Sequence, residues 1–309
     1  MAAATKSDKI PAIEITKLVK QYPSASSPAV KDFSLTCYGG EIVGLLGHNG
    51  AGKSTTLKCL TGMLPFTSGK ICINGYNIKT SPVKAKFTFG FVSDKHDVFV
   101  KMTGIQYINF MADAYDISKE ERERSLRELD EIFKLGDKLS DPISTYSHGM
   151  RQKICMMGSL IHRPKLWILD EPMIGLDPLT YARVSEYMRE YAAKGNCILF
   201  SSHNVNSVRK ICTRAVIINN GVKTDDINFK VSNLSGEDLE NYFLERTVKK
   251  IEKTNITTAS DNEKASGNES IKQNQADKVN VTTTPISDLE NAKQNQSGED
   301  TEGTAEIEE

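Results

Sequence analysis

Short apolar runs alternate with amphipathic stretches along the first 250 residues of the chain. Apolar runs of strand length between turn residues predict strands, whereas apolar positions every three or four residues predict helices. The expected strands are 12–19, 31–37, 41–46, 88–92, 166–169, 197–201 and 215–218. The expected helices are 53–64, stopped by Pro65, then 104–115 and 118–135. This alternation predicts an α/β fold in which helices cover a sheet.

The segment 118–135 shows the helical pattern most clearly. Ser118 and Glu121 have the spacing of a capping box at its start. Its apolar face consists of Leu126, Leu129, Ile132 and Phe133. We expect this face to be core rather than a binding surface, because a surface helix buries its apolar stripe against the protein.

Residues 251–309 differ in composition from the rest. They contain 13 acidic residues and 5 lysines, have no aromatic residue, and are rich in Asn, Ser, Thr, Gln and Glu. Such a segment cannot bury enough apolar surface to offset its chain entropy. We therefore expect a disordered acidic, polar tail, either without a fixed role or serving as a docking segment. Residues 1–10 are expected to be a flexible N-terminus, and 11–250 the folded unit.

Composition narrows the class of protein. The chain has 309 residues and a formal charge of −1, which argues against a nucleic-acid partner held by bulk positive charge. No stretch approaches the roughly 18 apolar residues of a membrane-spanning helix, and the first residues lack a signal-peptide core. We expect a cytoplasmic protein. Its six cysteines are scattered without a CxxC pair, which is typical of reduced, mostly buried thiols.

The segment GHNGAGKST, residues 47–55, matches the pattern G-x-x-x-x-G-K-[ST]. It follows an expected buried strand and precedes an expected helix, the context that a phosphate-binding loop requires. Its glycines allow successive backbone N–H groups to face phosphates, and the helix N-terminus adds a favourable dipole. Lys53 is expected to contact the β- and γ-phosphates, and Ser54 to give its hydroxyl to Mg²⁺. The motif predicts a nucleotide bound with Mg²⁺.

Asp170 and Glu171 end the apolar segment LWILDEP, residues 166–172. In open α/β sheets, ligands bind at the carboxyl ends of the strands. Asp170 is therefore expected near the Mg²⁺ held by Ser54, and Glu171 near the water that attacks the γ-phosphate. An Asp-Glu pair after a strand is by itself more often a solvated turn. The phosphate-binding loop upstream reverses that preference.

Further motifs specify a family. YSHGMRQK begins at Tyr146, MIGLDP follows Pro172, and ILFSSHN contains His203. With these motifs the sequence resembles the nucleotide-binding subunit of ABC transporters, over roughly residues 13–247. The family's signature segment matches residues 146–150, its D-loop matches 175–177, and its switch histidine matches His203. Tyr22 is at the position of an aromatic residue that stacks on adenine. The YS-x-GM form resembles the branch whose members mostly export substrates.

The resemblance implies a fold and an assembly. The fold would be a P-loop NTPase core with a mixed or mostly parallel sheet, an N-terminal antiparallel β subdomain and a helical subdomain inserted at about 95–150. Two ATP-binding subunits, identical or different, would form a head-to-tail dimer with each ATP between Lys53 of one subunit and Ser147 of the other. A separate integral membrane subunit would move the substrate, so the chain would be peripheral on the inner face of the membrane.

The expected site combines the motifs with this resemblance. The expected nucleotide contacts are Tyr22, Gly47, His48, Asn49, Gly50, Ala51, Gly52, Lys53, Ser54, Thr55, Ser147 and Gly149. The expected catalytic residues are Lys53, Glu171 and His203. The expected ligands of Mg²⁺ are Ser54, Asp94 and Asp170. The predicted reaction is hydrolysis of ATP.

The chain departs from the family pattern at several positions. Asp94 is present where the family usually has the Q-loop glutamine. A carboxylate still provides a hard oxygen ligand for Mg²⁺, but it is charged and shorter. His148 replaces a glycine of the signature, which adds bulk and a titratable group. Ser207 and Thr213 replace residues that are commonly acidic in the family, a change without a physical explanation.

A soluble ABC-type ATPase that acts on ribosomes or DNA is the alternative function. Translation factors of that kind usually have two nucleotide-binding domains, whereas this sequence has one copy of each motif. The DNA-repair kind has a long coiled-coil insertion, for which the sequence shows no pattern. A binding module without turnover is disfavoured because all the expected catalytic residues are present.

Overall fold

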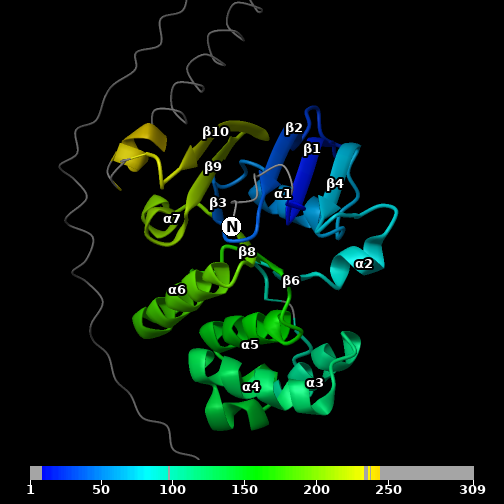
Figure 1. Ribbon diagram of the computed structural model, residues 1–309, viewed down its shortest axis with the longest axis vertical. Helices are drawn as coiled ribbons and strands as arrows, with labels where there is room; N and C mark the ends of the chain where they lie inside the picture. Colours follow the sequence, from blue (N-terminus) through cyan, green and yellow to red (C-terminus); the bar gives the residue numbers. More distant parts are fainter. Residues whose placement is uncertain (1–8, 97, 233–235, 237, 244–309) are drawn as a thin grey trace, which may run out of the picture. The chain divides into compact units, whose positions relative to one another are not determined.

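The computed structural model describes residues 9–96, 98–232, 236 and 238–243. The predictions of a disordered tail and, apart from residues 9 and 10, of a flexible N-terminus concern residues outside this description. Within it, the chain has the predicted α/β architecture, with two sheets and helices around them (Figure 1).

The central sheet has six strands in the order β10-β9-β3-β8-β7-β6. All neighbours pair in parallel except β10, which is antiparallel to β9. The strands are β3 (Ile42–Leu46), β6 (Phe89–Val92), β7 (Leu166–Asp170), β8 (Cys197–Ser202), β9 (Arg214–Asn219) and β10 (Val222–Asn228). This order places β3 and β7 on either side of β8, so that the segments following the three strands meet at one edge.

Strand β3 shows why these strands have continuous apolar sequences. All five of its residues are buried. Val43 and Leu45 pack into the core shared with the second sheet, while Ile42 and Leu46 pack into the core shared with helices on the opposite face. Because side chains alternate between the faces of a strand, a sheet covered on both sides requires apolar residues at every position.

The second sheet is antiparallel, with strand order β2-β1-β4-β5. Its strands are β1 (Ile13–Lys20), β2 (Val30–Cys37), β4 (Ser68–Ile73) and β5 (Tyr76–Asn77). Helix α1 (Lys53–Leu60) contributes Leu57 and Leu60 to the core between the two sheets. This arrangement matches the N-terminal antiparallel sheet implied by the family resemblance.

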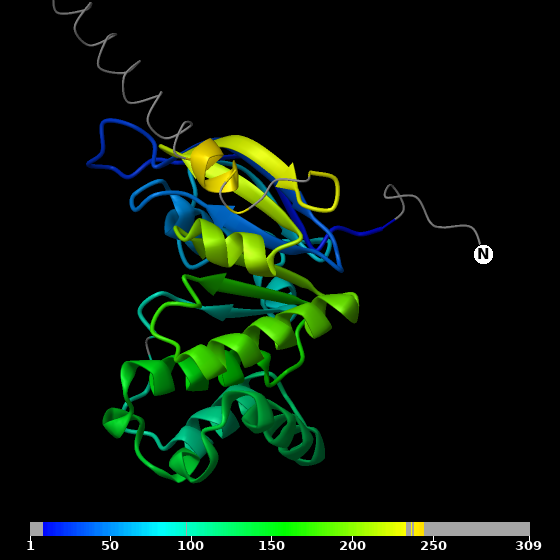
Figure 2. The same cartoon turned by 90° about the vertical axis from the view of Figure 1, so that its left-hand side faces the viewer.

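The other helices are short or lie on the opposite face of the central sheet. They are α2 (Pro82–Lys86), α3 (Gly104–Ala114), α4 (Lys119–Phe133), α5 (His148–Leu160), α6 (Pro178–Ala193) and α7 (Val205–Ile211), with 3₁₀ turns at Gly136–Ser140 and Ile143–Thr145. Helices α3, α4 and α5 lie together at the end opposite the antiparallel sheet (Figure 2). Residues 104–160 therefore supply a helical region between β6 and β7.

Helix boundaries correct and extend the sequence predictions. Helix α1 ends at Leu60 rather than residue 64, because Gly62 has φ 71° and the chain leaves the helix before it reaches the proline. Ser118 Oγ accepts a hydrogen bond from the Glu121 N–H at 3.2 Å, which is one of the two bonds of the predicted capping box. A complete, reciprocal capping box begins α3, between Thr103 and Gln106.

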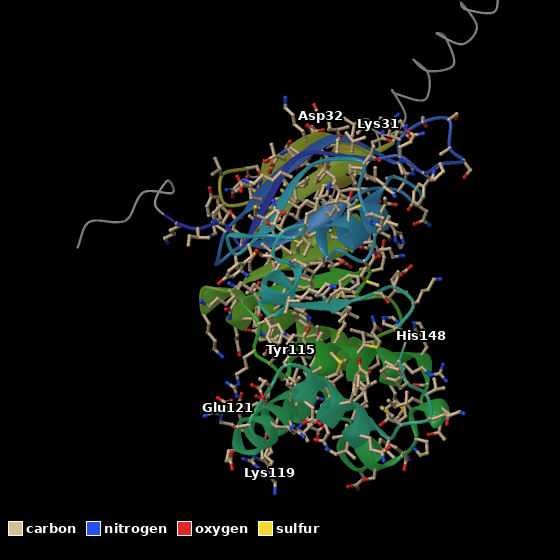
Figure 3. All side chains as sticks on the ribbon, turned by 90° about the vertical axis from the view of Figure 1, so that its right-hand side faces the viewer. Lys31, Asp32, Tyr115, Lys119, Glu121 and His148 are labelled. Atoms are coloured by element: carbon tan, nitrogen blue, oxygen red, sulfur yellow. The ribbon has the colours of Figure 1, made fainter. Side chains whose placement is uncertain are left out.

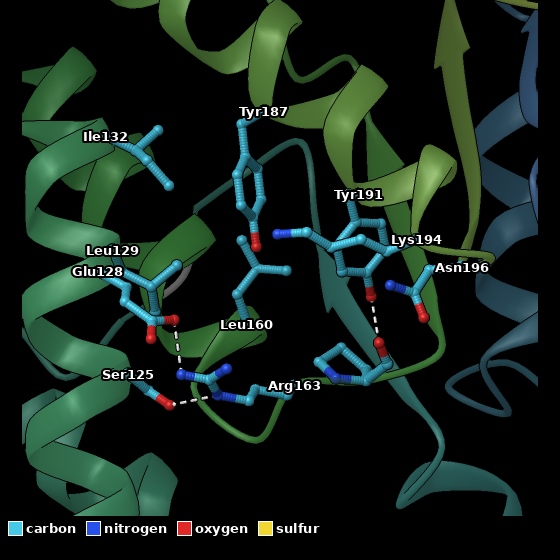
Figure 4. A pocket seen from close by; sticks show the side chains of 11 residues that line it. Ser125, Glu128, Leu129, Ile132, Leu160, Arg163, Tyr187, Tyr191, Lys194 and Asn196 are labelled. Carbon is cyan, nitrogen blue, oxygen red and sulfur yellow. Dashed lines mark hydrogen bonds and ion pairs between the residues drawn. The ribbon is translucent and has the colours of Figure 1, made fainter.

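The predicted inner face of α4 is core. Leu129 and Phe133 are buried, and Leu126 and Ile132 pack against the same cluster. Beside this contact, residues of α4 and α6 line a cavity of about 130 Å³ (Figure 4). Arg163 lines one side of it: its Nε donates to Ser125 Oγ at 2.9 Å, and its Nη2 donates to Glu128 Oε2 at 2.5 Å. The guanidinium of Arg163 thus connects α4 to the turn between α5 and β7.

The six cysteines are free and buried, as their spacing predicted. Among the described residues, none of the helices has the length and apolarity needed to cross a membrane.

Candidate active site

The loop 47–52 connects β3 to α1 and closes back on the sheet edge. The Gly47 N–H donates to Ser202 O at 3.2 Å, and the Gly221 N–H donates to Ala51 O at 2.9 Å. Gly52 has φ 106°, and a Cβ there would lie 2.7 Å from Ala29 O. Only glycine fits this conformation and this contact. The loop is therefore held by its neighbours in the curled form that the glycines allow.

Lys53 begins α1, and its ammonium group turns back over the loop. Its Nζ donates to Gly47 O at 2.8 Å and to His48 O at 3.2 Å. The same Nζ lies 3.4 Å from Glu171 Oε1. Lys53 is buried, with 5% of its surface exposed. A buried cation is stable only when paired and hydrogen-bonded. Its position above the loop is where an anionic phosphate would be held.

Asp170 ends β7 and is completely buried. Its Oδ1 accepts hydrogen bonds from Ser54 Oγ at 3.1 Å and from Ser201 Oγ at 2.5 Å. Burial raises the pKa of Asp170, and the two hydroxyl donors partly oppose that shift. Within the described residues, its Oδ2 is buried without a hydrogen-bond partner.

A hard divalent cation would suit this pair of oxygen groups. A buried carboxylate oxygen without a partner is costly, and a cation would satisfy it. The adjacent Ser54 hydroxyl supplies a second oxygen ligand, and Mg²⁺ normally completes its shell with phosphates and water. The chemistry of the donors therefore fits the predicted Mg²⁺.

Glu171 follows β7 directly and has φ 51°, a conformation that costs roughly 1–3 kcal/mol in a residue other than glycine. Its N–H donates to Ser201 Oγ at 2.9 Å. Its Oε1 lies 3.1 Å from His203 Nδ1 as well as close to Lys53. The carboxylate is thus fixed between two basic groups, beside a cavity of about 260 Å³. That volume leaves room for water next to a potential base.

The signature segment lies apart from this group. Ser147 is exposed and caps α5, its Oγ accepting from the Met150 N–H at 3.3 Å. A Cβ on Gly149 would lie 3.1 Å from Gly175 O, so the first turn of α5 packs against the segment after β7. No hydrogen bond within the described residues joins Ser147 or Gly149 to the loop 47–55.

Comparison with known proteins identifies the family. Residues 30–174 match the ABC transporter family. The chain is 33% identical over 195 residues to the ABC-type transporter ATP-binding protein EcsA of Bacillus subtilis, covering 63% of this chain and 79% of EcsA. It is 34% identical over 192 residues to the linearmycin resistance ATP-binding protein LnrL of the same organism, covering 62% of both proteins, less than two thirds of LnrL. The chain belongs to the ABC transporter family.

A solved structure of an ATP-binding subunit of an ABC transporter has the same fold. It superposes with a TM-score of 0.70 at 31% identity, covering 75% of this chain and 99% of that one. The described residues are therefore an ABC ATPase domain. The motifs on its strand edge are those of an ATP-binding member of the family.

Two more predicted residues of this ABC domain lie near the loop. The Tyr22 hydroxyl is 3.5 Å from Thr55 Oγ1, and Lys20 Nζ lies 4.9 Å from the centre of the Tyr22 ring. Asp94 Oδ1 is 3.8 Å from Lys58 Nζ. The negative charge of Asp94 also contributes to the raised pKa of Asp170. Tyr22 and Asp94 thus both lie beside the phosphate-binding loop and the start of α1.

His48 and Asn49 form the outer part of the loop. His48 Nε2 is 3.1 Å from Asn219 Oδ1, at the end of β9, and its Nδ1 is 2.7 Å from Asn49 O. Asn49 and Gly50 are exposed, and Gly50 has φ 81°. Asn49 and Gly50 are therefore open to solvent, while His48 and Gly47 are held by β9 and β8.

The structure adds residues that the sequence reading missed in the ABC domain. Ser201 bonds both Asp170 Oδ1 and the Glu171 N–H, which fixes the two carboxylates relative to each other. Gln152 is fully buried on α5 and donates to Pro172 O at 2.5 Å. Ser201 could have been found from its place at the end of an apolar strand. Gln152 had no comparable signal, because its partner is distant in the sequence.

Proposed function

We propose that the chain is the ATP-hydrolysing subunit of an ABC exporter and drives a separate integral membrane subunit from the cytoplasmic face of a membrane. One observation carries this proposal: Lys53 Nζ and His203 Nδ1 both contact Glu171 Oε1. The Ser54–Asp170 pair lies next to them. These groups have the charges and the positions that hydrolysis of a Mg²⁺-bound triphosphate requires.

In the proposed reaction these residues bind the phosphates, activate a water molecule and hold Mg²⁺. Lys53 exchanges its loop carbonyls for oxygens of the β- and γ-phosphates. Glu171 Oε1 orients a water molecule and accepts its proton, while His203 holds the carboxylate and faces the γ-phosphate. Ser54 and Asp170 would hold Mg²⁺, which when bound neutralises phosphate charge.

The proposed active unit is a head-to-tail dimer. Support comes from the separation between the two parts of the site: the strand edge is assembled within the chain, whereas Ser147 is exposed at a helix N-terminus. A helix N-terminus favours an anion through its free N–H groups and dipole. In the dimer, Ser147 of one copy would contact the γ-phosphate held by Lys53 of the other copy.

Mixing two inactive variants tests the dimer. Lys53→Ala removes the phosphate contact, and Ser147→Arg fills the space that a partner's nucleotide would occupy. Each variant alone is expected to lack ATPase activity. Their mixture should recover about a quarter of the wild-type rate, because half the dimers are mixed and each has one intact site. A mixture no more active than its components would exclude the shared site.

Docking of the membrane subunit is proposed on the loop and helix that follow β6. Phe99 and Phe110 are 54% and 43% exposed, and their rings meet edge to face at 5.1 Å between centroids. Val100 adds a third exposed apolar side chain. Contiguous exposed apolar side chains are typical of protein interaction sites. The same loop contains Asp94, so docking would act directly on the edge of the active site.

Export as the direction of transport rests on two further observations. The signature has the YS-x-GM form at residues 146–150 that resembles the exporter branch. The relative LnrL is a resistance protein, and resistance to a toxic compound is consistent with its removal from the cell. The family resemblance favours this function over a ribosome- or DNA-associated ATPase.

Purification from membranes tests the partner. A tagged full-length chain is expected to retain an integral membrane protein in mild detergent. Phe99→Asp combined with Phe110→Asp should release that protein, whereas Val231→Asp, at an 82% exposed position elsewhere, should not. Recovery with ribosomes and without a membrane protein would favour the alternative function.

A further inference from the structure

His148 is the first residue of α5 and contacts the loop that follows β6. Its ring meets the ring of His96 edge to face, with 5.1 Å between centroids and an angle of 73°. His96 is 7% exposed and has φ 49°, whereas His148, labelled in Figure 3, is exposed. The histidine that replaces a signature glycine is therefore exposed on one side and packed against another ring on the other. It rests on the loop that contains Asp94.

Besides His96, the ring of His148 contacts the segment after β7. Gly175 has φ 82°, and a Cβ built there would lie 2.8 Å from His148 Cδ2. The ring therefore packs against the backbone of Gly175, at a distance that leaves no space for a side chain. Two residues of α5 strengthen this junction, since Gln152 binds Pro172 O and Lys153 Nζ lies 3.5 Å from Asp177 Oδ2.

His148 thus touches two loops of different origin. One is the loop after β6, with Asp94 near the site and Phe99 on the surface. The other is the segment 171–177, which starts with Glu171 and whose first residues are fixed through Pro172. A glycine at position 148 would contact neither the His96 ring nor Gly175 by a side chain, so this connection depends on the histidine.

We propose that His148 is a positioning residue for ATP hydrolysis: its ring is a spacer that couples the placement of the loop after β6 to the placement of the segment containing Glu171. The inference rests on the proposed ATPase function. The coupling acts through packing of the ring against His96 and Gly175. Displacement of a catalytic group by an ångström costs as much as about 100-fold in rate, so loss of a spacer should lower turnover.

Substitutions of His148 separate this role from a structural one. His148→Ala is expected to lower kcat about tenfold while changing the KM for Mg·ATP less than about twofold, because the ring packs on His96 and Gly175 while Ser147 keeps the proposed nucleotide contact. His148→Phe keeps an aromatic ring at the same place and should restore at least half of the wild-type kcat. Thermal unfolding should show both variants to be folded. Wild-type kcat in the Ala variant, or equal loss in the Phe variant, would overturn the proposal.

A double-mutant cycle tests the contact itself. His96→Ala and His148→Ala should be non-additive in the logarithm of kcat, since either change removes the same ring contact. The matched control combines His96→Ala with Arg151→Ala, on the same turn of α5, whose guanidinium binds Ser144 O instead. That pair should be additive. Additivity for the His96–His148 pair would overturn the proposal.

Wild-type activity distinguishes this inference from the function on which it rests. If the wild-type full-length chain does not hydrolyse ATP in the presence of Mg²⁺, the proposed function fails and His148 has no reaction to position. If the wild type hydrolyses ATP and the His148 variants behave like it, the function stands and the role of His148 is refuted.

Discussion

The two parts of the proposed nucleotide site are built in opposite ways. At the strand edge, the polar groups are largely buried and bind one another, as with Asp170 and its two serine donors. At the start of α5, Ser147 and His148 are exposed, and their contacts are to their own helix or to loops. The first part is assembled within one chain, while the second presents its polar groups outward.

This difference indicates which part of the molecule is rigid and which part can move. Parallel strands fix the strand edge through backbone pairing, such as Asp170 opposite Ser201. The helical region is joined to the sheet by side chains, in a shared apolar core and in contacts such as the Arg163 bridge and the stack of Tyr115 on His162. Side-chain contacts are easier to rearrange than a hydrogen-bonded ladder, so the helical region is the part expected to move during a cycle.

The largest expected effect tests the strand edge. Glu171→Gln should reduce ATP turnover by at least about 100-fold, because an amide cannot accept a proton from the attacking water. Binding of ATP should persist, since Lys53 and its loop are unchanged, and a stable ATP-dependent dimer should appear by size-exclusion chromatography. Glu186→Gln, on the surface of α6, is the control. Turnover near that of the wild type would remove Glu171 from the proposed role.

A pH-dependent effect tests the attachment of the helical region. The rings of His162 and Tyr115 stack at 3.6 Å, and His162 Nε2 lies 3.2 Å from Phe89 O. Burial lowers the pKa of His162 to about 4. In the unfolded chain that pKa is about 6.5. As the pH falls below about 6.5, the unfolded state takes up a proton that the folded state does not, and stability is lost until about pH 4.

Replacing the imidazole should therefore reduce the sensitivity to acid. Between pH 7 and 5, His162 is expected to remove up to about 2 kcal/mol from the free energy of unfolding of the wild type. His162→Phe keeps a ring against Tyr115 but cannot be protonated. Urea unfolding at both pH values should show a smaller loss in the variant, even if it is less stable at pH 7 through loss of the bond to Phe89. If wild type and variant lose the same free energy of unfolding between pH 7 and 5, His162 is not the group responsible for the acid sensitivity.

The smallest expected effect concerns the bonds of Arg163 to α4, beside the cavity in Figure 4. Arg163→Ala should lower the free energy of unfolding by about 0.5–1 kcal/mol, because the ion pair with Glu128 is half exposed. Lys138→Ala is the control, since it removes an exposed ion pair with Asp141, three residues further along the chain. The Arg163 variant should lose more stability, because its guanidinium also binds the buried Ser125, and ATP affinity should be unchanged. Equal losses would show that α4 does not depend on this bridge.

Local patterns predicted most of the elements that position the site. Strands β3, β7 and β8 were predicted within two residues, since each is apolar throughout and buried on both faces. Strand β10 was missed, because VKTDDIN at the edge of the sheet is largely polar and is held by pairing with β9. The five-residue helix α2 was missed for a similar reason, being too short to show a period.

The sequence by itself determined the phosphate-binding loop and the acidic pair, since their function depends on residue types at fixed spacing next to a strand. Only the tertiary structure decided which groups meet: the pairing of β7 with β8 brings Ser201 to Asp170, and the packing of α5 brings His148 to His96 and Gly175. Spacing along a chain fixes what a segment can bind locally. Contacts between distant segments depend on strand order and helix packing, which no single segment encodes.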